Sequence, residues 1–164
     1  MLRDKNLIPL SHQHQHALAL CVRIDRAVQA GEVDLPAWRA EIDLLFRQEI
    51  DFHFRAEEQH LFPAAAQFAE LRTLVDELLL QHGELRHFFS AAGSGTLDNA
   101  SLGQFGKNLS VHIRKEERDL FEGIQQRMTV DELSALGTAL NEALLPASDA
   151  CIIPTETTRL KPRR

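Results

Sequence analysis

The chain has 164 residues, of which 44% are hydrophobic and 26% are charged, as is typical of one globular domain with a sizeable core. Its net charge of −6 argues against a general nucleic-acid binder, which is normally basic. The two cysteines, Cys21 and Cys151, do not have the spacing of a metal or redox pair, so no disulfide framework is expected. We also expect no signal peptide and no membrane span, because no stretch approaches the length of about 20 apolar residues that a bilayer requires. The expected location is therefore the cytoplasm.

The hydrophobic pattern predicts an all-α protein, because apolar residues recur at helical spacing and no strand pattern is present. The first helix is expected from about residue 12 to residue 30, with Ser11 as its N-cap and Gly31 after its end. Asp34 is expected to cap the second helix. This helix should end or kink at Leu61-Phe62-Pro63, because proline interrupts helical hydrogen bonding.

Two further long helices and one short helix follow. The third is expected over about residues 68–91 and the fourth over about residues 98–128, on either side of a loop rich in glycine and serine. Thr129 and Glu132 have the spacing of a capping box, which predicts a shorter fifth helix that ends near Leu145.

Four long amphipathic helices joined by short loops favour an up-down-up-down four-helix bundle. In that topology the first and third helices are diagonally opposite, and so are the second and fourth. We assign residues 1–145 to the bundle, including its short fifth helix, and residues 146–164 to a flexible basic tail. This irregular tail is a weak candidate for contact with an acidic partner.

A ten-residue motif occurs twice, once on the second predicted helix and once on the fourth. Residues 53–62 (HFRAEEQHLF) and 112–121 (HIRKEERDLF) are identical at six of ten positions. In each copy a phenylalanine seven residues before the His lies on the same helical stripe as the His and the Glu four residues later. The core should therefore contain His53, Glu57, His112 and Glu116. Burying an ionised carboxylate is costly unless it is paired or binds a metal.

The first and third helices are expected to add one histidine each to the space between the two motifs. His82 lies on the apolar stripe of the third helix. On the first helix His14 is the best choice, because using His12 or His16 would put a polar or charged residue on the core stripe. We expect His12 and His16 to be solvated. Four imidazoles and two carboxylates suit iron, zinc, copper or manganese, and two opposed carboxylates are well placed to bridge two ions.

With these residues in place, the sequence resembles the hemerythrin-like family of HHE cation-binding domains. The family pattern is a His on helix 1, His-x-x-x-Glu on helix 2, a His on helix 3 and His-x-x-x-Glu on helix 4. The resemblance covers about residues 8–128, including the opening Pro-Leu-Ser-His-Gln-His. It implies two non-haem iron ions per chain, bridged by Glu57 and Glu116 with an oxygen or hydroxide between them. The implied metal ligands are His14, His53, Glu57, His82, His112 and Glu116.

The function implied by the resemblance is binding of oxygen, nitric oxide or peroxide for sensing, storage or scavenging, with no nucleic-acid or membrane partner and with any redox partner unknown. The alternative is a di-iron enzyme that reduces peroxide or nitric oxide, or that donates iron for repair of iron–sulfur centres. A structural zinc bundle is a third possibility.

Two positions depart from the animal oxygen-carrying hemerythrins. Arg86 stands where those proteins have a fifth His, and Glu117 stands where they have an Asp. The bridging ligand from the fourth helix is therefore either Glu116 or Glu117. Glu49, one turn before His53, either orients that imidazole by a hydrogen bond or lies on an exposed rim.

A ferritin-like ligand set is disfavoured. It would use the Glu-x-x-His pairs Glu57/His60 and Glu84/His87, and each of the other two helices would then have to supply one carboxylate. The first helix offers only Asp25, far from His14, and the motif on the fourth helix would have no role.

Overall fold

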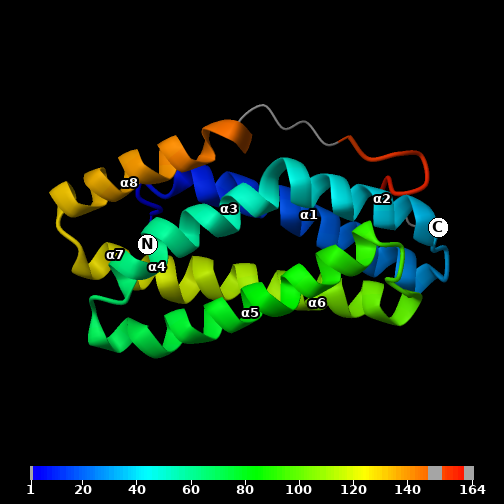
Figure 1. The fold of residues 1–164 in the computed structure, drawn as a ribbon, viewed down its shortest axis with the longest axis horizontal. Helices are drawn as coiled ribbons and strands as arrows, with labels where there is room; N and C mark the ends of the chain where they lie inside the picture. Colours follow the sequence, from blue (N-terminus) through cyan, green and yellow to red (C-terminus); the bar gives the residue numbers. More distant parts are fainter. Residues whose placement is uncertain (1, 148–152, 161–164) are drawn as a thin grey trace.

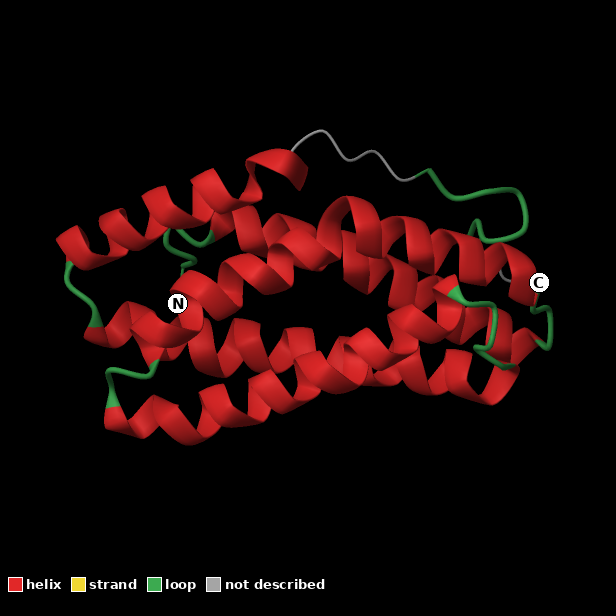
Figure 2. Ribbon diagram, in the orientation of Figure 1, coloured by secondary structure: helices red, strands yellow, loops and turns green. Residues whose placement is uncertain are grey.

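The computed structural model describes residues 2–147 and 153–160. Within these residues the chain is helical throughout, with loops and turns between the helices and no strand (Figure 2). The described elements form four long helices, which run along the length of the molecule (Figure 1). The first is α1 (Ile8–Ala30) and the third is α5 (Ala69–Gly93). None of the described helices combines the length and apolar character that crossing a membrane would require.

The second and fourth long helices are each built from α-helical segments joined by π-helical turns. The second comprises α2 (Leu35–Leu45), the π turn η1 (Phe46–Ile50), α3 (Asp51–Ala56), the π turn η2 (Glu57–Leu61) and α4 (Phe62–Ala65). The fourth comprises α6 (Asn99–Lys115), the π turn η3 (Glu116–Leu120) and α7 (Phe121–Arg127). A shorter helix, α8 (Val130–Leu144), and the 3₁₀ turn η4 (Leu145–Ala147) follow.

Most predicted helix ends are confirmed by their caps. Asp34 accepts a hydrogen bond from the Ala37 amide at 3.1 Å, and Asp98 accepts one from the Ser101 amide at 2.8 Å. Thr129 forms the predicted capping box. Gly31 ends α1 with a φ of 67°, a left-handed conformation that favours glycine.

Two predicted helix ends differ from the structure. The first helix begins at Ile8, so Ser11 lies inside it and is not its N-cap. Pro9 is part of the first turn, where a missing N–H costs nothing because it would have no partner. The second long helix runs through Pro63 to Ala65, because Pro63 comes two residues after a π turn that already interrupts the α-helical hydrogen-bond pattern.

The long helices alternate in direction, which confirms the predicted bundle topology. α1 packs along α6, α6 packs along α5, and α5 packs along α2. The first and third long helices are therefore diagonally opposite, as are the second and fourth. The two copies of the repeated motif consequently face each other across the bundle interior.

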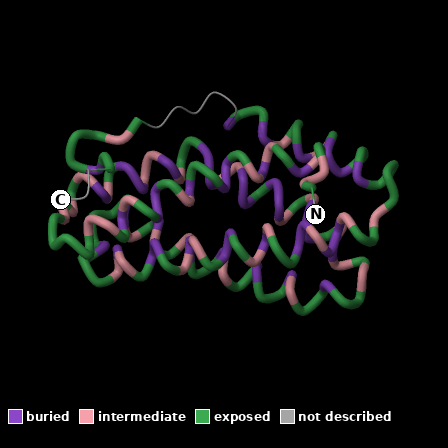
Figure 3. Tube along the Cα trace, turned by 180° about the vertical axis from the view of Figure 1, so that it is seen from behind, coloured by how far each residue is buried: buried purple, intermediate pink, exposed green. Residues whose placement is uncertain are grey.

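The core consists of two hydrophobic clusters, and buried positions line the inward sides of the long helices (Figure 3). One cluster contains Trp38 and Phe105. The other contains Phe121 together with leucines of α8, which packs against α3 and η2. α8 comes close to the N-terminal segment at Gly137, where an added Cβ would lie 2.4 Å from the Asn6 side-chain oxygen. The fifth helix is therefore part of the bundle core.

Of the predicted tail, the structure describes residues 146–147 and 153–160. Thr158 is fully buried, and Arg23 donates a hydrogen bond to its carbonyl oxygen at 2.8 Å while it also pairs with Glu41. The basic end at 161–164 lies outside the described residues. The flexibility of the tail and the domain boundary at residue 145 stay predictions.

Truncation after Ala147 should leave the metal content unchanged, because the six predicted ligands and α8 are all retained. It should lower the stability by about 1 kcal/mol, since Arg23 loses one buried acceptor. Metal analysis and thermal unfolding of the truncated and complete chains test this. Loss of metal from a truncated chain of unchanged helicity would contradict the prediction.

Candidate metal centre

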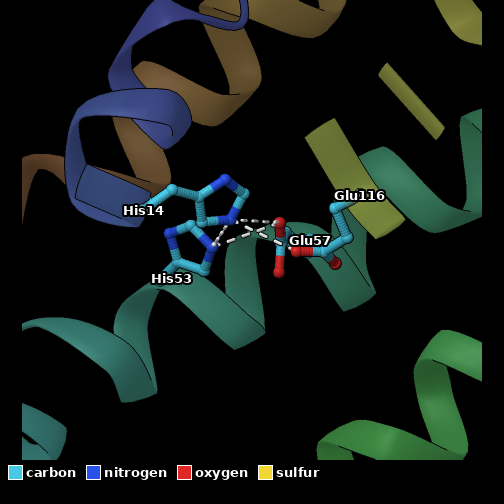
Figure 4. A group of neighbouring side chains, drawn as sticks. All are labelled: His14, His53, Glu57 and Glu116. Carbon is cyan, nitrogen blue, oxygen red and sulfur yellow. Dashed lines mark hydrogen bonds and ion pairs between the residues drawn. The ribbon is translucent and has the colours of Figure 1, made fainter. Parts of the chain in front are cut away.

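The four long helices bring all six predicted ligands together inside the bundle. One group of potential ligand atoms comes from His14, His53, Glu57 and Glu116 (Figure 4). A second group comes from Glu57, His82, His112 and Glu116. Within each group all ligand atoms lie within 4.8 Å of one another, and none of the six residues is more than 3% exposed. Both glutamates belong to both groups.

The carboxylate of Glu57 is oriented as a bridge between the two groups. Its Oε1 lies 3.2 Å from His53 Nε2, and its Oε2 lies 3.3 Å from His82 Nε2. Glu57 therefore directs one oxygen to each group.

Glu116 reaches the same two groups from the opposite side. Its Oε2 lies 3.2 Å from His14 Nε2 and 3.3 Å from His112 Nε2. Each glutamate thus lies between imidazoles from two different helices.

The atoms at the centre are buried and lack hydrogen bonds. Among the described residues, both oxygens of Glu57, both oxygens of Glu116, and Nε2 of His82 and of His112 have no hydrogen-bond partner. The remaining two imidazoles, His14 and His53, face each other with their Nε2 atoms 3.0 Å apart. A buried polar atom without a partner costs about 1–3 kcal/mol, and more if it is charged. Cations in this space would be coordinated by all of these lone pairs, so the residues present fit a metal centre.

Two of the four imidazoles are held from outside by carboxylates. His14 Nδ1 lies 2.7 Å from Glu117 Oε1, and His82 Nδ1 lies 2.7 Å from Glu58 Oε1. Because a carboxylate only accepts hydrogen bonds, each Nδ1 donates, and the Nε2 lone pair is left for the centre.

The other two imidazoles are held by amides. His53 Nδ1 donates to Gln13 Oε1 at 2.8 Å, and His112 Nδ1 donates to Gln81 Oε1 at 3.0 Å. Gln13 precedes His14 and Gln81 precedes His82, so a Gln-His pair on the first and third long helices forms a second internal repeat. Sequence reasoning missed both glutamines, although this repeated pair was a signal that could have found them.

The two outer carboxylates are themselves paired with arginines. Arg86 donates to both oxygens of Glu58, at 2.6 and 3.1 Å, and lies over the Phe54 ring at 5.3 Å from its centroid. Arg3 donates to Glu117 at 2.6 Å. The two halves of the centre therefore have matching outer layers, from imidazole to carboxylate to guanidinium.

The structure places the residues of several alternatives that the sequence left open. Glu116 faces the centre, whereas Glu117 contacts His14 from outside and is 25% exposed in its side chain. His14 is buried, and both His12 and His16 are exposed. Glu49 is buried, but its partner is His16 and not the His53 imidazole.

Each glutamate shared by the two groups is the first residue of a π turn, Glu57 in η2 and Glu116 in η3. A π turn contains an extra residue, so the residues after it are rotated about the helix axis relative to an uninterrupted α-helix. Leu61 and Leu120, the last residues of the two π turns, are fully buried. π turns within α-helices are frequent at functional sites.

Without metal, the pKa values of the buried groups are strongly shifted. Burial alone would lower the pKa of His14, but its close contacts with the carboxylates of Glu116 and Glu117 outweigh burial and raise that pKa to about 10. The pKa of His82 is likewise raised to about 9, because Glu57 and Glu58 outweigh its burial. Burial lowers the pKa of His112 to about 4. In the metal-free protein, protons on His14 and His82 thus balance the charge of the glutamates.

Glu57, Glu58 and Glu117 are ionised for the complementary reason. Burial alone would raise the pKa of Glu57, but His53 and His82 hold it well below the ordinary value. Against the same effect of burial, the hydrogen bonds from His82 and Arg86 lower the pKa of Glu58 to about 2. Burial alone would also raise the pKa of Glu117. Its hydrogen bonds, of which the one from His14 has the largest effect, instead lower that pKa to about 2. Anionic carboxylates are thus available to bridge metal ions and to orient imidazoles.

Comparison with known proteins agrees with this geometry. No curated protein and no solved structure matches the chain. The family described as "Hemerythrin HHE cation binding domain" matches residues 9–124, which is more than half of the chain and includes all six residues of the centre. The chain therefore belongs to the hemerythrin HHE cation-binding family.

Proposed function

We propose that this centre holds two iron ions, bridged by Glu57 and Glu116, and that it binds oxygen, nitric oxide or peroxide for sensing, storage or scavenging. The observation that carries the proposal is that two groups of ligand atoms share both glutamates. Each ion would receive two imidazoles and an oxygen from each carboxylate. Such a set is typical of first-row transition metals and leaves coordination positions open on an ion that takes five or six ligands. Bound iron would supply redox chemistry at these positions.

The side chains around the centre restrict what can reach it. The Phe54 ring stacks on His82 with 3.8 Å between ring centroids, and Phe121 stacks on His14 at 5.6 Å. Both phenylalanines are at most 1% exposed. These apolar walls favour small, weakly polar ligands over larger or charged ones.

The placement of Arg86 favours an open coordination position on the ion that His82 and His112 would bind. It lies one turn after His82, but its guanidinium is held by Glu58 and has no lone pair to offer a metal. This group therefore supplies two imidazoles, and a further position on its ion is left for an external ligand.

The test is metal analysis of protein expressed with ample iron, combined with ultraviolet–visible spectroscopy. We expect about two irons per chain and an absorption band that changes on addition of azide and is lost on reduction. One tightly held zinc per chain without a chromophore would contradict the proposal and indicate a structural metal. Sustained consumption of peroxide or nitric oxide with excess reductant would instead favour the enzyme alternative.

A further inference from the structure

Outside the metal centre, one buried carboxylate also has an oxygen without a hydrogen bond. Glu49 is 3% exposed, and its Oε1 has no hydrogen-bond partner among the described residues. Within residues 2–147 and 153–160, the other glutamates with such an oxygen are Glu57 and Glu116. Glu49 thus shares with the two candidate bridging ligands a buried carboxyl oxygen that is costly to leave unpaired.

The second oxygen of Glu49 already contacts a histidine at the surface. Oε2 lies 3.0 Å from His16 Nδ1, and the His16 side chain is 61% exposed. Ligand atoms about 2.0–2.2 Å from a zinc ion, at angles of 90–110°, are about 2.8–3.6 Å from each other. The nitrogen and oxygen of this pair are therefore already as far apart as two ligands of one ion.

A third ligand is available one helical turn away. His12 and His16 are both exposed on α1 at i, i+4 spacing, at which two histidines on one helix face bind a single zinc ion. The ligand atoms of Glu49, His16 and His12 are not among those that lie within 4.8 Å of one another in the structure, so the exposed His12 side chain has to change rotamer to join the other two.

The pair between Glu49 and His16 is not part of the internal repeat. Glu49 lies four residues before His53, and the corresponding position before His112 is Asn108. Glu49 also lies in the π turn η1, whereas α6 is α-helical across the equivalent stretch. The buried centre is matched in both halves, so this one-sided feature is not explained by it.

We propose that Glu49, His16 and His12 form a second, exchangeable site for a divalent first-row cation such as zinc, on the outer side of the first and second long helices. Two imidazoles and one carboxylate leave a fourth tetrahedral position for water. Because both histidines are exposed to solvent, this site should bind its cation more weakly than the buried centre does. The bound cation should therefore exchange readily with cations in solution. The inference is independent of the proposed iron chemistry.

The experiment uses the complete protein with its buried centre as purified and Zn²⁺ alone as the probe, measured by equilibrium dialysis and metal analysis. Wild type should bind one zinc ion more than Glu49→Gln or His16→Ala. Removing one ligand should weaken zinc binding at least about tenfold, and His12→Ala should also weaken it. Glu49→Gln keeps the side-chain shape and an acceptor for His16, so the fold and the iron content should be unchanged.

His87→Ala is the matched control, because His87 is an exposed histidine three residues after the exposed Glu84 on α5, with no buried carboxylate in that pair. It should bind zinc as wild type does. Equal zinc binding by wild type and Glu49→Gln would overturn the proposal, because Glu49 and His16 would then form an ion pair and no zinc site. So would equal losses in His16→Ala and His87→Ala, which would show non-specific binding to surface histidines. Failure of the iron proposal would appear separately, in the content and spectrum of the buried centre.

Discussion

Replacement of either bridging glutamate by alanine should reduce the metal content from about two ions per chain to one or none. Glu57 and Glu116 are fully buried, and each contributes to both groups of ligand atoms. Without one of them, two neighbouring cations would lose half of their anionic ligands in an interior that water does not reach. The four imidazoles alone should not retain both ions. Metal analysis of Glu57→Ala and Glu116→Ala after dialysis measures the effect.

Glu58 and Glu117 provide matched controls, because each directly follows Glu57 or Glu116 in the same helix. Glu58→Ala and Glu117→Ala remove the acceptor that orients His82 or His14. Loss of such an outer hydrogen bond should lower metal affinity about 10–100-fold while the site still fills at high metal concentration. If Glu117→Ala emptied the centre and Glu116→Ala did not, the fourth helix would be rotated relative to this structure.

The inward positions of the six ligands were predictable because the hydrophobic stripe and the ligands obey the same helical periodicity. Phe105 and Leu109 fix the buried face of α6, and His112 and Glu116 lie on its continuation. The same phase argument correctly placed His14, and not its exposed neighbours, inside the bundle. Periodicity therefore determined which residues face the interior, and the internal repeat indicated that the two motifs do so together.

The π turns were not predictable from local sequence, because nothing in the propensities of Glu57–Leu61 disfavours an α-helix. The partners of His53 and His112 were missed for a similar reason. A hydrogen bond between Gln13 and His53 depends on the register of two neighbouring helices, which periodicity within one helix does not define. The contact between Glu49 and His16 likewise depends on that register.

The metal-free protein should lose stability as the pH rises from 6.5 to 8.5. In the folded chain the pKa values of His14 and His82 are raised to about 10 and about 9, whereas both are near 6.5 in the unfolded chain. Over this range the folded protein keeps two protons that the unfolded chain releases, so its stability falls with pH. The stabilising contribution is complete below pH 6.5 and is lost as the pH rises through 9 to 10. His112, with a pKa lowered to about 4, stays neutral in this window.

Metal binding should displace the same two protons, because His14 and His82 must offer neutral Nε2 atoms to the ions. At pH 7.5 we therefore expect release of about two protons per filled centre and an affinity that rises steeply with pH. Calorimetric titration in buffers of different ionisation enthalpy measures the protons, and thermal unfolding of chelator-treated protein measures the stability. Metal-loaded protein is the control, and its unfolding temperature should vary less between pH 6.5 and 8.5. If the unfolding temperature of the metal-free protein instead rose between pH 6.5 and 8.5, neither His14 nor His82 would carry the additional proton in the folded chain.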